Sequence, residues 1–259
     1  MTTVEAGTSV GELLRDWRQR RRLSQLDLAG EAGVSSRHLS FLETGRSRPS
    51  REMVLHLAEH LEVPLRARNE LLLAAGYAPV YGRRRLEDPD MAAVRTALDL
   101  VLAAYEPAPA LVVDRGWHLV TGNRALALLT AGADPALLEP PVNVLRLGLH
   151  PRGLAPRILN LPQWRTHLLT RLAREAHLTA DPALSALHRE LVAMPGGTDR
   201  RLPDGIAVPL RLRHGDDVLS FLSTVTTFGT AVDLTAAELS VEAFLPADAH
   251  TAEVLRALS

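Results

Sequence analysis

The sequence predicts an α+β protein in which a unit of short helices precedes a unit that contains an antiparallel sheet. Residues 9–76 show helical apolar periodicity, with serines where helices begin and glycines where they end. Residues 79–90 hold prolines and charges without apolar periodicity, which is typical of a linker, and later residues mix helical stretches with alternating ones. We therefore expect a helical domain over residues 1–78, a linker over 79–90 and a mixed domain over 91–259.

Composition excludes several kinds of chemistry. The chain has 259 residues, 46% of them hydrophobic, no cysteine, and arginine as its only basic residue apart from histidine. Disulfides, thiolate nucleophiles, Schiff bases and phosphate-binding loop lysines are therefore excluded. No apolar run is long enough to span a bilayer and the N-terminus does not resemble a secretion signal, so we expect a cytoplasmic protein that makes no membrane contact. The heavy use of arginine favours a bacterium with a GC-rich genome.

Charge is divided unevenly along the chain. Residues 1–85 contain 14 Arg and 10 acidic residues, whereas residues 86–259 contain 15 Arg and 20 acidic residues. A basic first part fits an anionic partner, although this excess alone is also compatible with ordinary surface variation.

Five helices are expected in the first unit because each begins at a capping residue and carries an apolar stripe. Ser24 and Asp27 have the spacing of a capping pair, and Gly33 and Gly45 follow the ends of two helices. The expected helices are 10–22 after Ser9, 25–32 after Ser24, a third from Ser35 to Gly45, a fourth from Ser50 to Leu61, and a fifth from Pro64 to about Gly76.

The second and third of these helices have the order and turn of a helix-turn-helix motif, which predicts binding to double-stranded DNA. Leu39 and Leu42 belong to the shared core, which leaves a polar face near the start of the third helix. Arginine and serine on such a face can contact base edges, whereas Phe41 can contact a thymine methyl group or pack within the protein. The candidate DNA-binding residues are Gln25, Ser35, Ser36, Arg37, Ser40, Phe41, Arg46 and Arg48, with Gln25, Arg46 and Arg48 expected on phosphates.

The second unit combines helices and strands. Residues 110–113 and 117–121 predict a hairpin, residues 91–104, 123–129, 164–176 and 182–193 predict helices, and residues 206–213, 218–228 and 239–245 predict strands. Residues 218–228 carry apolar and small polar side chains on both faces, so we expect one face to pack on helices and the other to line a cavity.

Two short motifs that suggest an enzyme are better explained structurally. Gly7–Gly11 matches a nucleophile elbow, but no strand precedes it, and Ser9 serves as a helix cap. His56 and His60 match an inverted zinc-hydrolase motif, but the apolar stripe of their helix turns both toward solvent. We expect neither a catalytic residue nor a metal site, and therefore no enzyme.

Residues 9–78 resemble the DNA-binding domain of the xenobiotic-response-element class, and within it the MmyB-like regulators, through SQLDLAGEAGVSSRHLSFLETGRSRPSREMVLHLAEHL and LLLAAGYAP. The later stretches NVLRLGLHPRGLAPRILN, WRTHLLTRL and FLSTVTTFGTAVDLTAAELSVEAFLPAD are similar to those regulators too. The resemblance implies a PAS-like α/β ligand-binding domain and a fatty-acid-type effector, with no other cofactor. The candidate pocket residues are Trp117, Leu126, Leu145, Trp164, Leu168, Phe221 and Val225, with Asn123, Arg146 and His150 as polar ends.

Two functions remain open at this point. The first is a DNA-binding transcriptional regulator whose C-terminal domain senses a hydrophobic small molecule. The second is a DNA-binding regulator whose C-terminal domain only dimerises or binds a protein partner. A homodimer is expected in both, because one recognition helix reads only a few base pairs.

Overall fold

The computed structural model describes residues 8–199, 207–229 and 231–258. The chain divides into two compact units, Met1–Arg83 with Val232–Leu234, and Arg84–Ala231 with Thr235–Ser259. The boundary between the two units, after Arg83, falls within residues 79–90, the segment for which the sequence predicts a linker. Ile206, the first residue of the strand predicted over residues 206–213, lies outside the described residues.

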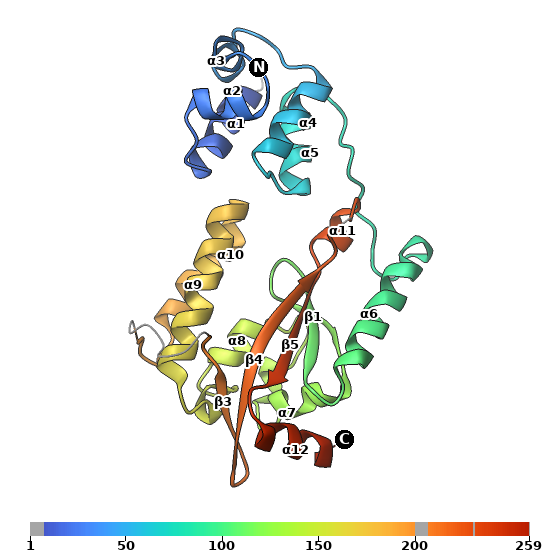
Figure 1. The fold of residues 1–259 in the computed structure, drawn as a ribbon, viewed down its shortest axis with the longest axis vertical. Helices are drawn as coiled ribbons and strands as arrows, with labels where there is room; N and C mark the ends of the chain where they lie inside the picture. The colour runs from blue at the N-terminus through green and yellow to red at the C-terminus, as the bar shows by residue number, and fades with distance from the viewer. Residues whose placement is uncertain (1–7, 200–206, 230, 259) are drawn as a thin grey trace, which may run out of the picture. The chain divides into compact units, whose positions relative to one another are not determined.

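The first unit contains five α-helices, as predicted (blue to cyan in Figure 1). Serine side chains accept a backbone N–H three residues ahead at four of the five helix starts, which confirms the predicted caps. Ser9 with Glu12 and Ser24 with Asp27 form complete capping boxes. The helices are α1 (Val10–Arg20), α2 (Gln25–Glu31), α3 (Ser36–Glu43), α4 (Arg51–His60) and α5 (Leu65–Ala74).

A leucine-rich core joins the five helices. Its members come from every helix and are almost entirely removed from solvent: Leu14, Leu28, Leu39, Leu42, Val54, Leu57, Leu61, Leu71 and Leu72. The short α3 therefore owes its position to the leucines on its buried face, since a helix of this length is not stable alone in water.

A buried ion pair connects α1 to the end of α3. Arg18 Nε and Nη2 donate to the two carboxylate oxygens of Glu43 at 2.7 and 2.9 Å, and Arg18 Nη1 donates to the Leu23 carbonyl at 2.8 Å. The Glu43 side chain is fully buried. Burial by itself would raise the pKa of Glu43, but the hydrogen bonds from Arg18 and Gln25 outweigh it, and the pKa is lowered. Glu43 is therefore held as a carboxylate inside the helical unit.

Gly11 allows α1 to approach the end of α3 closely. A Cβ atom at this position would lie 2.4 Å from the Leu42 carbonyl oxygen and 2.8 Å from that of Glu43. These obstructing atoms belong to the backbone, so no side-chain rotation would relieve the clash. Only glycine fits this crossing.

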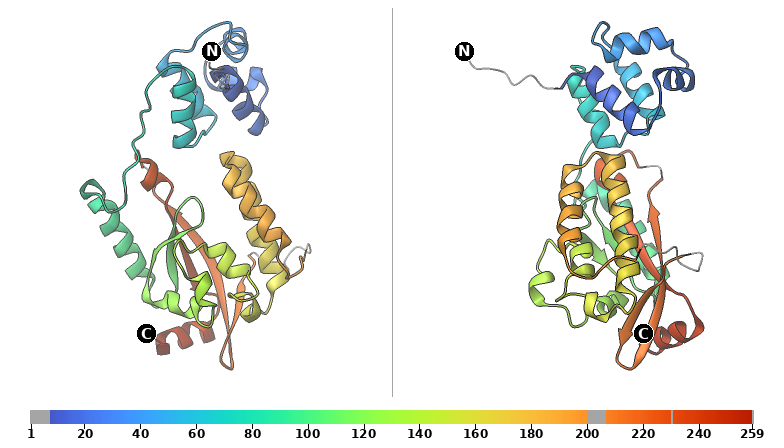
Figure 2. Two further views of the ribbon diagram at one scale, coloured as in Figure 1. Left: turned by 180° about the vertical axis from the view of Figure 1, so that it is seen from behind. Right: turned by 90° about the vertical axis from the view of Figure 1, so that its left-hand side faces the viewer.

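The second unit is built on a five-stranded antiparallel sheet with the order β2-β1-β5-β4-β3. Helix α6 covers one face and helices α7 to α10 lie on the other (Figures 1 and 2). The elements are α6 (Ala92–Tyr105), β1 (Ala110–Val113), β2 (Leu119–Gly122), α7 (Ala127–Thr130), α8 (Val144–Leu149), α9 (Leu161–Thr179), α10 (Pro182–Ala193), β3 (Leu210–His214), β4 (Asp217–Thr227), α11 (Leu234–Ala237), β5 (Ser240–Pro246) and α12 (Ala249–Leu258).

Alternation along the central strands divides the core into two layers. Ala110 and Val112 of β1 and Val241 and Ala243 of β5 pack with α6. Leu111 and Val113 of β1 and Phe244 of β5 belong to the larger layer on the opposite face. Strands β1 and β5 are therefore buried on both faces of the sheet.

The sequence predicts that one face of residues 218–228 packs on helices and that the other lines a cavity, but only the first half of β4 is buried. Leu219 and Phe221 are fully buried, but Leu222 and Val225 are 38% and 45% exposed. Residues 224–227 are all exposed because β4 has eleven residues and continues beyond the helices that cover its first half. Neither of the two hollows described below includes a residue of the second half of the strand.

We predict that Glu43→Gln lowers the free energy of unfolding by about 3–5 kcal/mol, because it leaves the Arg18 charge buried without a counterion. Denaturant titration of the full chain, followed by circular dichroism, measures the loss. Glu87→Gln is the control, since Glu87 pairs with Arg85 where both side chains are more than 70% exposed. Equal stability of Glu43→Gln and the wild type would contradict the importance assigned to the pair.

Candidate nucleic-acid interface and ligand cavity

Helices α2 and α3 form the helix-turn-helix predicted from the sequence. The turn between them contains Gly33, whose φ of +63° is a conformation that other residues adopt rarely. Leu39 and Leu42 of α3 point into the core, while Ser36 and Arg37 are exposed and Ser40 is half-buried. The N-terminal part of α3 thus presents hydroxyl and guanidinium groups to solvent, the groups that read base edges in a major groove.

Phe41 supports two arginines of this surface. The Arg37 guanidinium lies over the Phe41 ring at 5.3 Å from its centroid, and the Arg46 guanidinium lies at 5.9 Å. Such contacts are attractive because the ring face is negative. Phe41 is half-buried and contacts both guanidinium groups, so it helps to orient Arg37, and both roles left open by the sequence remain predictions.

Gln25 and Ser35 have structural partners. Gln25 Nε2 donates to Glu43 at 2.8 Å, and the Ser35 hydroxyl oxygen caps α3 by accepting from His38 N at 3.1 Å. The Gln25 amide carries a second hydrogen and the Ser35 hydroxyl has its own, so each can still donate to a phosphate. Arg46 and Arg48 are exposed, and neither has an ion-pair partner among the described residues.

We predict different effects for two arginine substitutions in this surface. Arg37→Ala costs about 1–3 kcal/mol on the operator and relaxes the preference at one base pair, because a base contact is lost. Arg48→Ala weakens binding to all duplexes alike and reduces the salt slope by about one unit. Titrations of operator and random duplex at several salt concentrations separate the two. Equal losses on both duplexes for Arg37→Ala would show that Arg37 does not read a base.

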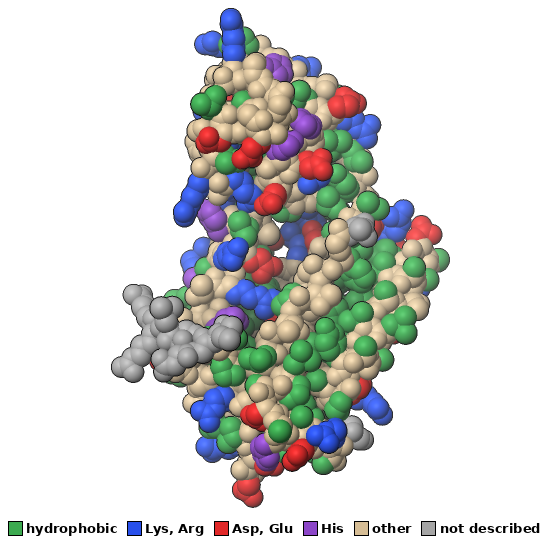
Figure 3. Space-filling view, in the orientation of Figure 1, with side chains coloured by type: hydrophobic (Ala, Val, Ile, Leu, Met, Phe, Trp, Pro, Cys, Tyr) green, Lys and Arg blue, Asp and Glu red, His purple; other side chains and the backbone are tan. Residues whose placement is uncertain are grey.

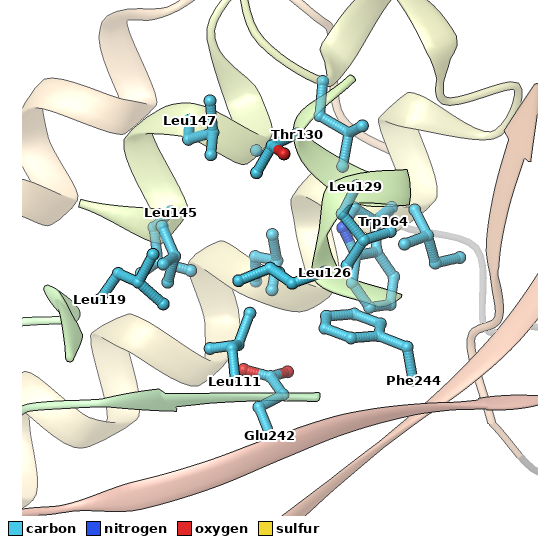
Figure 4. A pocket seen from close by; sticks show the side chains of 15 residues that line it. Leu111, Leu119, Leu126, Leu129, Thr130, Leu145, Leu147, Trp164, Glu242 and Phe244 are labelled. Carbon is cyan, nitrogen blue, oxygen red and sulfur yellow. The ribbon is translucent and has the colours of Figure 1, made fainter. Parts of the chain in front are cut away.

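An apolar cavity of about 70 Å³ lies in the second unit between the sheet and helices α7, α8 and α9 (Figure 4). Four predicted pocket residues line it: Leu126, Leu145, Trp164 and Leu168. The other lining residues are Leu111, Leu119, Leu129, Thr130, Val144, Leu147, Gly148, Leu154, Leu210, Glu242 and Phe244. The walls are mostly leucine, which favours an apolar occupant.

The remaining predicted pocket residues lie outside the lining. Asn123 accepts from Ala110 N and donates to the Ala108 carbonyl, so it holds the turn after β2. Arg146 pairs with Glu190 at 2.6 Å, and His150 Nδ1 accepts from Arg152 N. Phe221 is buried in the surrounding core, and Val225 is exposed. The three polar residues predicted for the cavity therefore bind other parts of the protein.

A larger hollow of about 360 Å³ lies near α7 and α12 and contains none of the predicted pocket residues. Its wall includes the Arg124 side chain, 92% exposed, and Leu258, 56% exposed. Its wall therefore contains exposed side chains as well as buried ones such as Leu255.

Trp117, also predicted for the pocket, belongs to a polar cluster beside the cavity. Its Nε1 donates to Glu175 at 3.1 Å, and the Arg171 guanidinium lies 4.5 Å from its ring centroid. Arg171 Nη1 also donates to Glu242 at 3.1 Å. Sequence reasoning missed this cluster, although a glutamate at an inward position of the apolar strand SVEAFLP was a usable signal.

The motifs rejected as enzymatic have ordinary environments. A ring nitrogen of His56 lies 2.7 Å from the Ala32 carbonyl, and the rings of His56 and His60 contact edge to face. The described residues contain no group of three potential ligands that could hold a metal ion. In the same part of the chain, no helix has both the length and the apolar character to cross a membrane.

We predict a pH-dependent effect at Glu175, whose pKa is raised by burial against the opposing hydrogen bond from Trp117. A carboxyl group with a raised pKa stabilises the fold at low pH, and that contribution is lost as the pH rises through the raised value. The melting temperature of Glu175→Gln should therefore exceed that of the wild type by a margin that grows as the pH is raised from 4 to about 8.

Glu190→Gln provides the matched control of opposite sign. The hydrogen bond from Arg146 lowers the pKa of Glu190, so this variant should lose stability relative to the wild type above the usual carboxyl pKa. Thermal melts of the three proteins across this pH range test both statements. A constant difference between Glu175→Gln and the wild type at every pH would contradict the first.

Comparisons with known proteins match both units. Residues 94–258 match the family model of the MmyB-like transcription regulator ligand binding domain, and residues 9–71 match a helix-turn-helix domain model. Among solved structures, the chain is similar to the clp gene regulator ClgR from Corynebacterium glutamicum, with 26% identity, 38% of this chain and 90% of that chain covered, and a TM-score of 0.23. No curated protein matches the chain.

Proposed function

The chain belongs to the family of MmyB-like transcription regulators, and we propose that it is a DNA-binding regulator whose C-terminal unit senses a hydrophobic, fatty-acid-like molecule. By fatty-acid-like we mean an alkyl chain with one polar end. The observation that carries the proposal is the cavity, whose wall is formed by leucines from the sheet and from three helices.

The size of the cavity suggests how binding is coupled to a change in shape. Its volume of about 70 Å³ is well below the range of about 300–1,000 Å³ that is usual for ligand pockets. An alkyl chain must therefore displace leucines of α7, α8 or α9 on entry. An effector that binds the expanded arrangement more tightly than the closed one can shift the equilibrium between them.

We also propose a homodimer, because two recognition helices about 34 Å apart would read two half-sites. Its support is the apolar surface of α6 and the sheet face beside it (Figure 3). Leu100 of α6 is 67% exposed, and strand alternation places Leu222, 38% exposed, on the same face of the sheet. Apolar surface of this kind is typical of protein contacts. It equally supports the second candidate, in which the C-terminal unit only dimerises or binds a protein.

Effector titration separates the two candidates. We expect a saturating long-chain fatty acid to change operator affinity by about 10- to 100-fold, and operator DNA to change effector affinity by the same factor. Calorimetric titration of the effector, with and without operator duplex, measures both. If both affinities stay the same, the sensing function is wrong and the second candidate is favoured.

Two variants control this experiment. Leu168→Phe adds volume to the cavity wall and should weaken effector binding while operator affinity without effector is retained. Val225→Ala changes an exposed residue outside the cavity and should leave both affinities unchanged.

A further inference from the structure

The segment that connects the two units is held by hydrogen bonds at its start. The Asn69 side chain of α5 accepts through Oδ1 from Val80 N at 3.0 Å and from Tyr81 N at 3.1 Å. Its Nδ2 donates to the Tyr81 carbonyl at 2.8 Å, and Arg68 Nη1 donates to the Tyr81 hydroxyl at 3.4 Å. Residues 80–81 are therefore fastened to the helical unit, within the segment for which the sequence predicts a linker.

The far end of the same segment is fastened to the second unit. Arg95 of α6 donates through Nη1 to the carbonyls of Leu86 and Asp88. The Leu86 side chain packs against the apolar layer between α6 and the sheet. The Asp88 carboxylate accepts from Arg85 N at 2.7 Å, which closes a local turn. Residues 85–88 therefore belong structurally to the second unit.

Helix α11 binds the backbone between these two fastened stretches. Leu234 N donates to the Gly82 carbonyl at 2.9 Å, and the Thr235 hydroxyl donates to the Arg84 carbonyl at 2.5 Å. Gly82 and Leu234 belong to the first unit, whereas Arg84 and Thr235 belong to the second. Two consecutive residues of α11 thus hold the chain on either side of Arg83, where the boundary between the units falls.

The same helix is followed in the chain by a strand that borders the cavity. Phe244 of β5 lines the cavity. Val241 and Ala243, the alternate residues of β5, face the opposite layer, which also contains Leu239 and packs against Leu86. A displacement of β5 when the cavity is filled therefore reaches both α11 and the layer that holds the connecting segment.

We propose that α11 transmits the effector signal to the DNA-binding unit through its hydrogen bonds to residues 82–84. This inference rests on the proposed sensing function and specifies how the two units are coupled. An effector that favours one position of β5 favours the matching position of α11, and the bonds to Gly82 and Arg84 impose it on the chain that leads to the first unit. A flexible linker would absorb such a displacement, whereas a segment held at both ends and in the middle passes it on.

Thr235→Val tests the contact, because it removes the hydroxyl and keeps the shape of the side chain. In the wild-type full chain, we expect saturating palmitate to change operator affinity by about 10- to 100-fold. In Thr235→Val this factor should fall below about threefold. The affinity for palmitate without DNA should be retained, because Thr235 does not line the cavity. Anisotropy of labelled operator duplex measures the factor, and calorimetric titration measures palmitate binding.

Two matched substitutions control this experiment. Thr235→Ser keeps a hydroxyl group and should keep the wild-type factor. The Thr179 hydroxyl donates to the Glu175 carbonyl within α9, so Thr179→Val removes a similar bond that does not involve the connecting segment. It should also keep the wild-type factor.

An insertion tests the connecting segment itself. A Gly-Ser-Gly-Ser insertion between Gly82 and Arg83 keeps both fastened stretches but lengthens the chain between them. Operator and palmitate should each still bind, whereas the factor should fall below about threefold. The same insertion between Gly215 and Asp216, in the turn between β3 and β4, should keep the factor. This pair of variants is decisive even if Thr235→Val does not fold.

The outcomes separate this inference from the proposed function. A factor of about tenfold or more that persists in folded Thr235→Val, or in the insertion after Gly82, overturns the role of α11 but leaves the sensing function intact. Operator affinity that palmitate does not change in the wild type overturns the sensing function and the coupling through α11 together.

Discussion

The buried pair of Arg18 and Glu43 is the interaction on which the DNA-reading unit depends. It fixes the end of α3 to α1 and, through Gln25, to the start of α2. The recognition helix has only eight residues and two buried leucines, so its orientation needs this additional constraint. An isolated charge in this interior would be costly, and the pair is tolerated because nearly every donor and acceptor in it is used.

A similar arrangement occurs in the second unit. Glu242 is also a buried carboxylate held by an arginine, Arg171, but it borders a cavity while Glu43 is enclosed by protein. Full enclosure makes the first pair structural. The second carboxylate lies in the wall of the cavity. The difference lies in what surrounds each pair, and the pairs themselves are chemically alike.

The sequence predicts the helices of the first unit well because serine caps and terminal glycines mark their ends locally. In the second unit, α10 is predicted residue for residue, whereas α8, α11 and α12 are missed. Helices α8 and α11 have only six and four residues, too few to show a clear period. Among the predicted pocket residues, Trp164 and Leu168 line the cavity, as the helix periodicity of their segment indicates. Arg146 and His150 lie outside its lining, because a polar residue beside an apolar stretch does not reveal which partner it binds.

Gly11 has a consequence for the divergence of proteins with this architecture. The close crossing of α1 and α3 is fixed by backbone contact, and the residues that maintain it, Gly11, Arg18 and Glu43, lie away from the exposed start of α3. Ser36 and Arg37 contribute nothing to the core. The side chains at the exposed start of α3 can thus change over a few codons while the scaffold stays constant, so duplicated genes can diverge on this surface without first losing a folded protein.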